Sequence, residues 1–131
     1  MNKRLRLSTF QIGSPRKRGE GLRISTTRRP PRGVPKSRRK RYGNFDVWLP
    51  ALAPTEKLIR RFKHRDWENP SVRKAFFDSY ERELLSTAVG RQNVEFVALV
   101  AKHIRASIGC YCEDESFCHR SRLFKIIKGF A

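Results

Sequence analysis

The stretch RRPPRGVPKSRRKRYG, residues 28–43, constrains the fold more than any other part of this 131-residue chain. Pro30, Pro31 and Pro35 each fix the backbone angle φ and lack an N–H donor, and Gly33 adds conformational freedom. Such a segment disfavours both a helix and a central strand. It therefore predicts a long basic loop between strand-like sequence before it and helix-like sequence after it.

Two segments before this loop have the alternating pattern of strands. They are LRLSTFQIG, residues 5–13, and LRISTT, residues 22–27. The sequence SPRKRGEG between them is rich in glycine and charge, which is typical of a turn. Periodicity alone leaves two arrangements open, a hairpin or two separate strands. Residues 1–21 are expected to be partly flexible.

The sequence after the loop has helical periodicity. Asn69 followed by Pro70 indicates a helix start, and apolar residues then recur every four positions from Val72 to Leu84, which predicts a helix over about 70–87. Thr55 is a candidate N-cap for an earlier helix with apolar residues on one face and cations on the other.

A helix, a strand and a helix are expected at the end of the chain. Gly90 should end the helix over 70–87, and Asn93 should cap the next one. ASIGCYC, residues 106–112, predicts a buried strand, and a last helix is expected from about Cys118 to Lys128. This order indicates an α/β fold, with residues 1–131 forming a single compact domain whose small sheet is covered by helices.

Charge is the strongest indication of a partner. The chain has a formal net charge of +18, and residues 1–41 hold fifteen Lys/Arg against one acid. Such a surface attracts polyanions in a salt-dependent way, so nucleic acid or another polyanion is the expected partner, although a basic face can also serve solubility alone. No apolar run is long enough for a membrane span, so no membrane contact is expected.

The first residues bear on location. MNKRLRLSTFQIG lacks the apolar middle region of a secretory signal, and the three cysteines show no dispersed disulfide framework, which together predict a cytoplasmic protein. An Arg-rich, acid-poor start is also typical of an organelle transit peptide, but the strand-like alternation argues against that alternative.

Four motifs together resemble the YeaO-like family, a bacterial and archaeal group catalogued as a domain of unknown function. They are RRPPRGVPK (28–36), DVWLPALAPTEKL (46–58), YERELL (80–85) and CYCEDESFCHRS (110–121), and the likeness covers about residues 22–128. The resemblance implies a compact α/β fold and a cytoplasmic protein, and no established reaction. It also implies an ordered role for Arg32 and Lys36. Residues 36–42 are more basic than the family pattern requires.

The cysteine stretch allows three interpretations. In the first, Cys110, Cys112, Cys118 and His119 hold a metal, with zinc a minor alternative and no cofactor required by the sequence. The spacing argues against this, because Cys110 and Cys112 would point to opposite faces of an extended strand, and because Cys118 and His119 are adjacent.

In the second interpretation, Cys118 is a nucleophile or ligand at a helix start, where a thiolate is stabilised. His119 would then act as acid or base and Arg120 as a clamp for an anion. The pattern of a Cys-x5-Arg phosphatase loop is absent. In the third, Cys110 and Cys118 are core residues, and Arg120 pairs with an acid such as Asp114.

Two functional hypotheses follow. The first is a domain associated with nucleic acid or phosphate, with an anion pocket at the Cys-His-Arg turn. The second is a small enzyme acting on a nucleotide or phosphorylated substrate through Cys118, His119 and Arg120. Both place Arg32 and Arg120 at one cleft. The residues expected to bind the anion or nucleic acid are Arg28, Arg29, Arg32, Lys36, Arg38, Arg39, Lys40, Arg41 and Ser121.

Overall fold

A computed structural model describes residues 5–29 and 33–130, without the side chains of Lys40 and Tyr42. Arg32 and the side chain of Lys40 were both expected to bind an anion, and both lie outside the part of the chain that the structure describes. The strands and helices are β1 Leu7–Gln11, β2 Leu22–Ser25, the 3-10 helix η1 Lys36–Arg38, α1 Arg39–Gly43, β3 Val47–Trp48, η2 Pro50–Leu52, α2 Glu56–Phe62, α3 Pro70–Leu85, α4 Ala88–His103, β4 Ala106–Cys110, η3 Glu115–Phe117 and α5 His119–Phe130.

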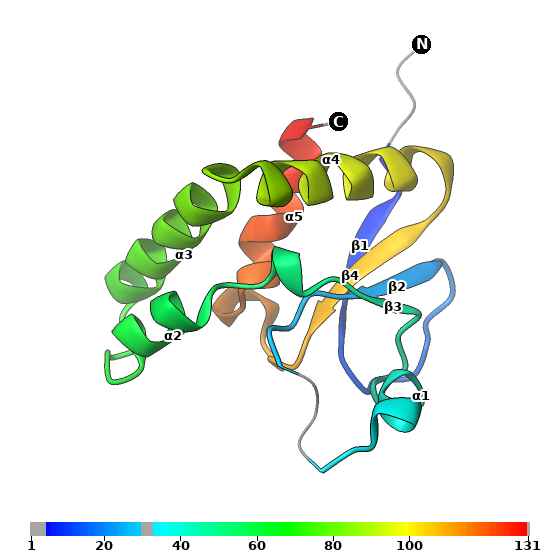
Figure 1. Cartoon of the computed structure of the whole chain (residues 1–131), viewed down its shortest axis with the longest axis horizontal. Coiled ribbons are helices and arrows are strands. Elements are labelled where there is room, and N and C mark those ends of the chain that lie inside the picture. Colours follow the sequence, from blue (N-terminus) through cyan, green and yellow to red (C-terminus); the bar gives the residue numbers. More distant parts are fainter. Residues whose placement is uncertain (1–4, 30–32, 131) are drawn as a thin grey trace.

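The sheet has the strand order β1-β4-β2-β3, and every neighbouring pair is parallel. β4 is the central strand, bonded to β1 at one edge and to β2 at the other (Figure 1), and it is buried along its whole length. β1 and β2 therefore do not form a hairpin, which settles the arrangement that periodicity left open. The expected α/β fold with a small sheet covered by helices is confirmed.

One face of the sheet carries the main core. Ile24 of β2 and Ile108 of β4 pack with apolar side chains of α3, α4 and α5. Tyr80 of α3 lies at the centre of this cluster, and its hydroxyl donates to the carbonyl of Leu52 at 2.5 Å. The bond satisfies a hydroxyl that would otherwise be costly to bury. The caps expected at Thr55 and Asn69 form at the starts of α2 and α3.

The other face is organised by a buried arginine. Arg23 of β2 is 0% exposed and lies 4.3 Å from the centre of the Phe10 ring. Its guanidinium donates to the Glu20 carboxylate at 2.5 Å and to the carbonyls of Ser14 (2.7 Å) and Asn44 (3.0 Å). The residue thus joins β2 to the turn after β1 and to the segment before β3. Sequence periodicity had not indicated a charged residue in this core.

Three expectations about helices were wrong, those for residues 36–43, for Gly90 and for Asn93. Residues 36–43 form η1 and α1 rather than continuing the loop, because Pro35 precedes the first turn and no proline follows within it. Gly90 does not end a helix: α4 starts at Ala88, with Thr87 accepting the Gly90 N–H at 3.0 Å. A Cβ at Gly90 would lie 1.9 Å from the Leu84 carbonyl oxygen, so glycine permits α4 to approach the end of α3.

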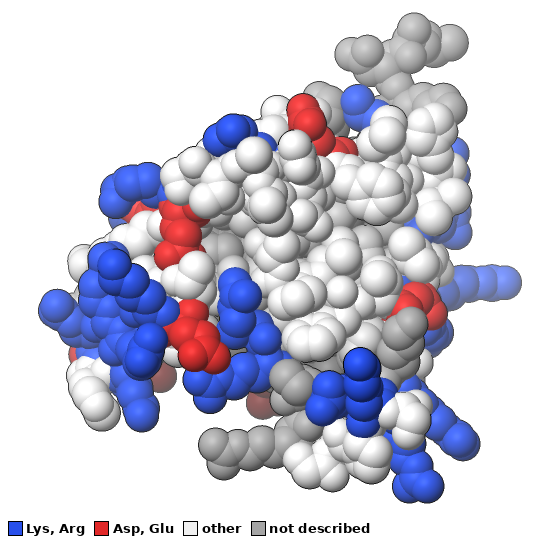
Figure 2. Space-filling view, in the orientation of Figure 1, with Lys and Arg blue, Asp and Glu red and all other residues white. Residues whose placement is uncertain are grey.

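Asn93, expected as an N-cap, lies inside α4 and donates to the Val89 carbonyl at 2.8 Å. The side chains of Val89, Phe96 and Leu99 on the same helix are exposed. Figure 2 shows Lys and Arg gathered over α2 and around α1, whereas the surface over α4 carries few charges. Charge is therefore uneven in space as well as in sequence.

Within the described ranges 5–29 and 33–130, none of the helices has the length and apolar character that crossing a membrane requires.

Replacing Arg23 by methionine should lower the free energy of unfolding by about 3–5 kcal/mol, because it leaves the Glu20 carboxylate and several carbonyls buried without their donor. Urea unfolding followed by circular dichroism measures the loss. The matched control is Arg18→Met in the exposed turn, expected within about 0.5 kcal/mol of the parent. Equal effects of the two substitutions would contradict the assigned role of Arg23.

Stability should also fall in acid. A hydrogen bond from Arg16 lowers the pKa of Asp46 against the opposing effect of burial, and the backbone N–H of Arg23 lowers it further. Because the folded pKa lies below the unfolded value of about 3.9, the contribution of Asp46 is complete above about pH 5 and is lost as the pH falls through the folded pKa. The midpoint of thermal unfolding, measured from pH 6 to pH 3, should fall less steeply for Asp46→Asn. Parallel curves for the two proteins would refute this assignment.

Candidate functional site

A cavity of about 470 Å³ lies at the carboxyl ends of β2 and β4. Ligands usually bind at this edge of a parallel α/β sheet. Its lining groups have three kinds of chemistry: sulfur and imidazole, apolar side chains, and cations. They include Cys110, Cys112, Cys118 and His119; Ile59, Trp67, Phe76 and Phe117; and Arg28, Arg29, Arg60 and Lys63.

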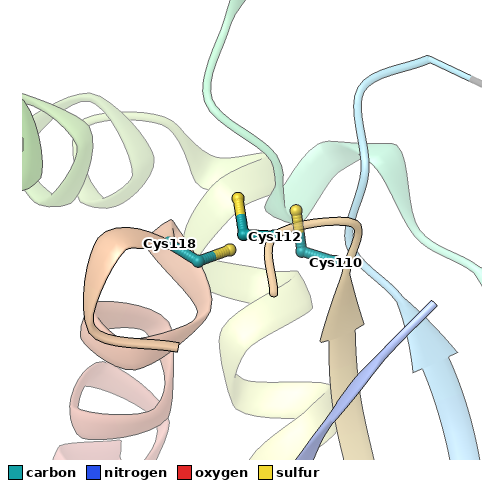
Figure 3. Close-up of side chains that lie close together, drawn as sticks. All are labelled: Cys110, Cys112 and Cys118. Atoms are coloured by element: carbon teal, nitrogen blue, oxygen red, sulfur yellow. The ribbon is translucent and has the colours of Figure 1, made fainter. Parts of the chain in front are cut away.

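The three cysteines converge in this cavity as free thiols, with their sulfurs all within 4.8 Å of one another. Cys110 ends β4, Cys112 lies in the following turn, and Cys118 immediately precedes α5 (Figure 3). In Figure 3 the sulfurs of Cys110 and Cys112 point the same way, and that of Cys118 points toward them. The expected divergence of Cys110 and Cys112 required an extended chain, but the strand ends at Cys110.

Arg120 fixes the turn that brings the sulfurs together. It is 4% exposed, and its Nη1 donates to the carbonyls of Cys112 at 2.7 Å and Cys110 at 3.5 Å. The guanidinium is not among the groups that line the cavity, unlike the exposed anion clamp expected from sequence. Among the described residues its guanidinium forms no ion pair with Asp114, whose carboxylate accepts from the N–H of Ser116 at 2.9 Å.

His119 is buried and held by the end of β2. Its Nε2 lies 3.0 Å from the carbonyl oxygen of Thr26, which can only accept, so Nε2 carries the proton. Burial lowers the pKa of His119 to about 4, which leaves the ring neutral at pH 7. Nδ1 is then an acceptor, and it lies 3.7 Å from the sulfur of Cys118. His119 is thereby placed beside the sulfur cluster.

The three thiols share protons unequally. Hydrogen bonds from Cys110 and Cys118 lower the pKa of Cys112, against the effect of burial, and the charge of Arg120 lowers it further. The hydrogen bond with Cys112 raises the pKa of Cys110, and hydrogen bonds with both neighbours raise that of Cys118. Of the three thiols, Cys112 is the one whose pKa is lowered. It is also the exposed one, whereas Cys118 is 1% exposed.

The cations expected to bind an anion fall into two groups. Arg28 and Arg29 line the cavity, where Arg28 donates to the carbonyls of Ala53 (3.0 Å) and Pro54 (3.1 Å) and Arg29 pairs with Glu56 at 2.9 Å. The other described residues of the set are not among the lining groups: Lys36, Arg38, Arg39 and Arg41 lie on η1 and α1, and the Ser121 hydroxyl donates to the Cys118 carbonyl at 2.8 Å.

Sequence reasoning missed part of the site. Arg60 and Lys63 line the cavity from α2 and the residue after it, and Trp67 forms part of the apolar wall. The cationic face of the helix after Thr55 was visible in the sequence, but nothing showed that it faces the cysteine turn. Cys112 was considered as a metal ligand alone.

A family model described as the active DUF488-N3 subclade, DUF488-N3a, matches residues 7–129. The chain belongs to the DUF488-N3a family. This is a family of unknown function, and the match confirms the expected membership of a YeaO-like group of that kind. Neither the curated proteins nor the solved structures include a match to the chain. The DUF488-N3a match covers the whole cysteine turn and both strands that end at the cavity.

The order in which the thiols react tests the geometry of this DUF488-N3a site. In metal-free protein, a thiol reagent should modify Cys112 first, because Cys110 and Cys118 are buried. Arg120→Met should open the turn and speed modification of the two buried thiols roughly 10- to 100-fold, which corresponds to the 1.5–3 kcal/mol typical of a hydrogen bond to a charged group. Peptide mapping after timed reaction measures each rate.

The control for that experiment is Arg122→Met on the same helix. Arg122 pairs with Asp78 at 2.9 Å near the surface, and its loss should leave the order and the rates of thiol modification unchanged. Equal reaction of all three thiols in the parent protein would contradict the described burial.

Proposed function

We propose that this protein is a small enzyme that binds an anionic small molecule with a flat apolar part, such as a nucleotide, and acts on it at the sulfur cluster. One observation carries the proposal: the sulfurs of Cys110, Cys112 and Cys118 meet in a cavity that cations also line. The cavity volume is within the range of small-molecule sites.

The cations support an anionic ligand. Arg29, Arg60 and Lys63 are exposed, and Arg28 is partly buried where its guanidinium meets the carbonyls after η2. Among the described residues that line the cavity, Glu56 is the one carboxylate, and it is already paired with Arg29. A phosphate at this opening therefore meets a net excess of positive charge, next to apolar walls that strengthen the attraction.

The apolar walls of the cavity are evidence that the ligand has a flat apolar part. Trp67 packs edge-on against Phe76, with ring centres 5.1 Å apart, and its indole N–H donates to the Phe117 carbonyl at 3.2 Å. The indole is thus fixed in place. Rigid aromatic side chains of this kind bind planar ligands at little cost in conformational entropy.

Cys112 is the sulfur placed to meet such a ligand, because it is the exposed member of the cluster. Cys118 and His119 lie deeper, joined by the 3.7 Å contact between Sγ and Nδ1. The proposal therefore keeps Cys118 and His119 in the site but gives Cys112 the position nearest the ligand. Arg120 acts through the turn that it holds, as a positioning residue.

A second candidate, contact with nucleic acid, is favoured by the charge. The net charge is +18, and Figure 2 shows cations over α2 and around α1. Lys36, Arg38 and Arg41 are exposed on this surface. A polyanion bound at these three residues would contact η1 and α1 rather than the cysteine cavity, so the two functions use separable residues.

The ligand is tested with adenosine monophosphate as the probe, by isothermal titration calorimetry. The double substitution of Arg60 and Lys63 by glutamate should weaken binding at least about 10-fold, equivalent to about 1.4 kcal/mol. The matched control replaces Arg38 and Arg41 by glutamate, which changes the net charge equally at exposed sites on η1 and α1. That control should leave binding unchanged.

Equal weakening by both double variants would refute a ligand site in the cavity. Salt-dependent binding of a single-stranded oligonucleotide, lost with the changes at Arg38 and Arg41 and retained with those at Arg60 and Lys63, would instead support the second candidate.

A further inference from the structure

The three sulfurs have the spacing of a metal site. A zinc–sulfur bond is about 2.3 Å, which places sulfurs of one tetrahedral site about 3.8 Å apart. The sulfurs of Cys110, Cys112 and Cys118 all lie within 4.8 Å of one another, so shifts of about 1 Å or less close them around one ion. We propose that these three sulfurs bind one Zn²⁺ ion and leave its fourth coordination position open to the cavity.

The donor set selects this kind of metal. Thiolates favour zinc and copper(I) over the hard cations magnesium and calcium, which require oxygen ligands. Asp114, one of the carboxylates between Cys112 and Cys118, is engaged by the N–H and hydroxyl of Ser116 at 2.9 and 2.7 Å. Three sulfurs with one open position match the catalytic class of zinc site rather than the closed structural class.

Each of the three cysteines is held in place by a different contact. Cys110 ends a fully buried strand, and Cys118 precedes α5, with its N–H bonded to the Glu115 carbonyl at 3.1 Å. Cys112 is held through its carbonyl by Arg120. A site that is already assembled binds a metal without paying the ordering cost that a flexible loop incurs.

The neighbouring charges suit the ion and its ligands. Three thiolates and one Zn²⁺ carry a net charge of −1, and the buried guanidinium of Arg120 lies against the carbonyls of two ligand residues. His119 is not part of the sulfur group, in agreement with the objection that adjacent residues close poorly on one ion. Its ring instead lies beside the cluster, with Nδ1 3.7 Å from the Cys118 sulfur, and is oriented by the carbonyl of Thr26.

The open coordination position would let the metal contact a ligand in the cavity. This part of the inference rests on the proposed function. Cys112 is exposed, and all three cysteines line the cavity. An ion held there faces the space between the aromatic wall and the cations. It would act as a Lewis acid toward a ligand bound in that space.

The test begins with the full chain purified without chelators, in which mass spectrometry of the metals should find about one zinc per chain. Cobalt(II) is then added to metal-free protein. Bands from thiolate-to-cobalt charge transfer should appear, and zinc should abolish them. Cys112→Ser should weaken zinc binding roughly 100-fold and reduce the charge-transfer intensity. Because Cys112 is exposed, this variant is the one expected to keep the fold, which circular dichroism checks.

Ser116→Ala, in the same turn but outside the sulfur group, is the control and should leave zinc binding unchanged. Protein that neither retains zinc nor develops thiolate–cobalt bands overturns the inference, as do bands that Cys112→Ser leaves unaltered.

Adenosine monophosphate titrated into zinc-free protein separates the two proposals. If the protein fails the zinc and cobalt tests but binds the nucleotide, the zinc inference is removed and the proposed function remains. Stoichiometric zinc in a protein that binds no nucleotide leaves the metal site and removes the proposed ligand.

Discussion

The central strand β4 is the constraint on which the remaining structure depends. It is buried along its length and bonds in parallel to β1 on one side and β2 on the other. Because the pairs are parallel, the chain leaves β2 and β4 at the same edge of the sheet. Thr26 then bonds through its N–H to the Gly109 carbonyl at 2.9 Å and contacts His119 at the start of α5. The cavity and the sulfur cluster exist at this edge for that reason.

Two arginines show why charge counted from sequence is a poor guide to the surface. Arg23 and Arg120 are 0% and 4% exposed, and both use the guanidinium mainly to satisfy backbone carbonyls. One guanidinium has several N–H donors, so each of these arginines satisfies more than one carbonyl at a place where the chain turns sharply. Part of the basic character of this protein therefore stabilises irregular backbone inside the fold. Cations that remain on the surface gather over α2 and around α1 (Figure 2).

The elements that sequence predicted well are those with local causes. Asn69 with Pro70 marks the start of α3, and the four-residue recurrence of apolar side chains defines its buried face. β3 was not predicted, because its two residues form a strand by pairing with the distant β2 rather than through a local sequence pattern. Cys112 is similar, because its place beside Cys118 depends on Arg120 and on a turn without a distinctive spacing. The prediction of one loop over residues 28–43 was too broad, because no proline follows Pro35 in that segment.

The pairing of β1 with β4 has a consequence for biosynthesis. Leu7 lies opposite Ala106, so the first strand finds its partner only after residue 106 has left the ribosome. Until then β1 and β2 lack the strand that separates them, and Phe10 and Ile24 have no complete core to enter. Contacts between such distant positions form slowly, and exposed strands are prone to aggregate meanwhile. β1 and β2 therefore lack their shared partner until β4 has been synthesised, which makes early engagement by chaperones an advantage for this topology.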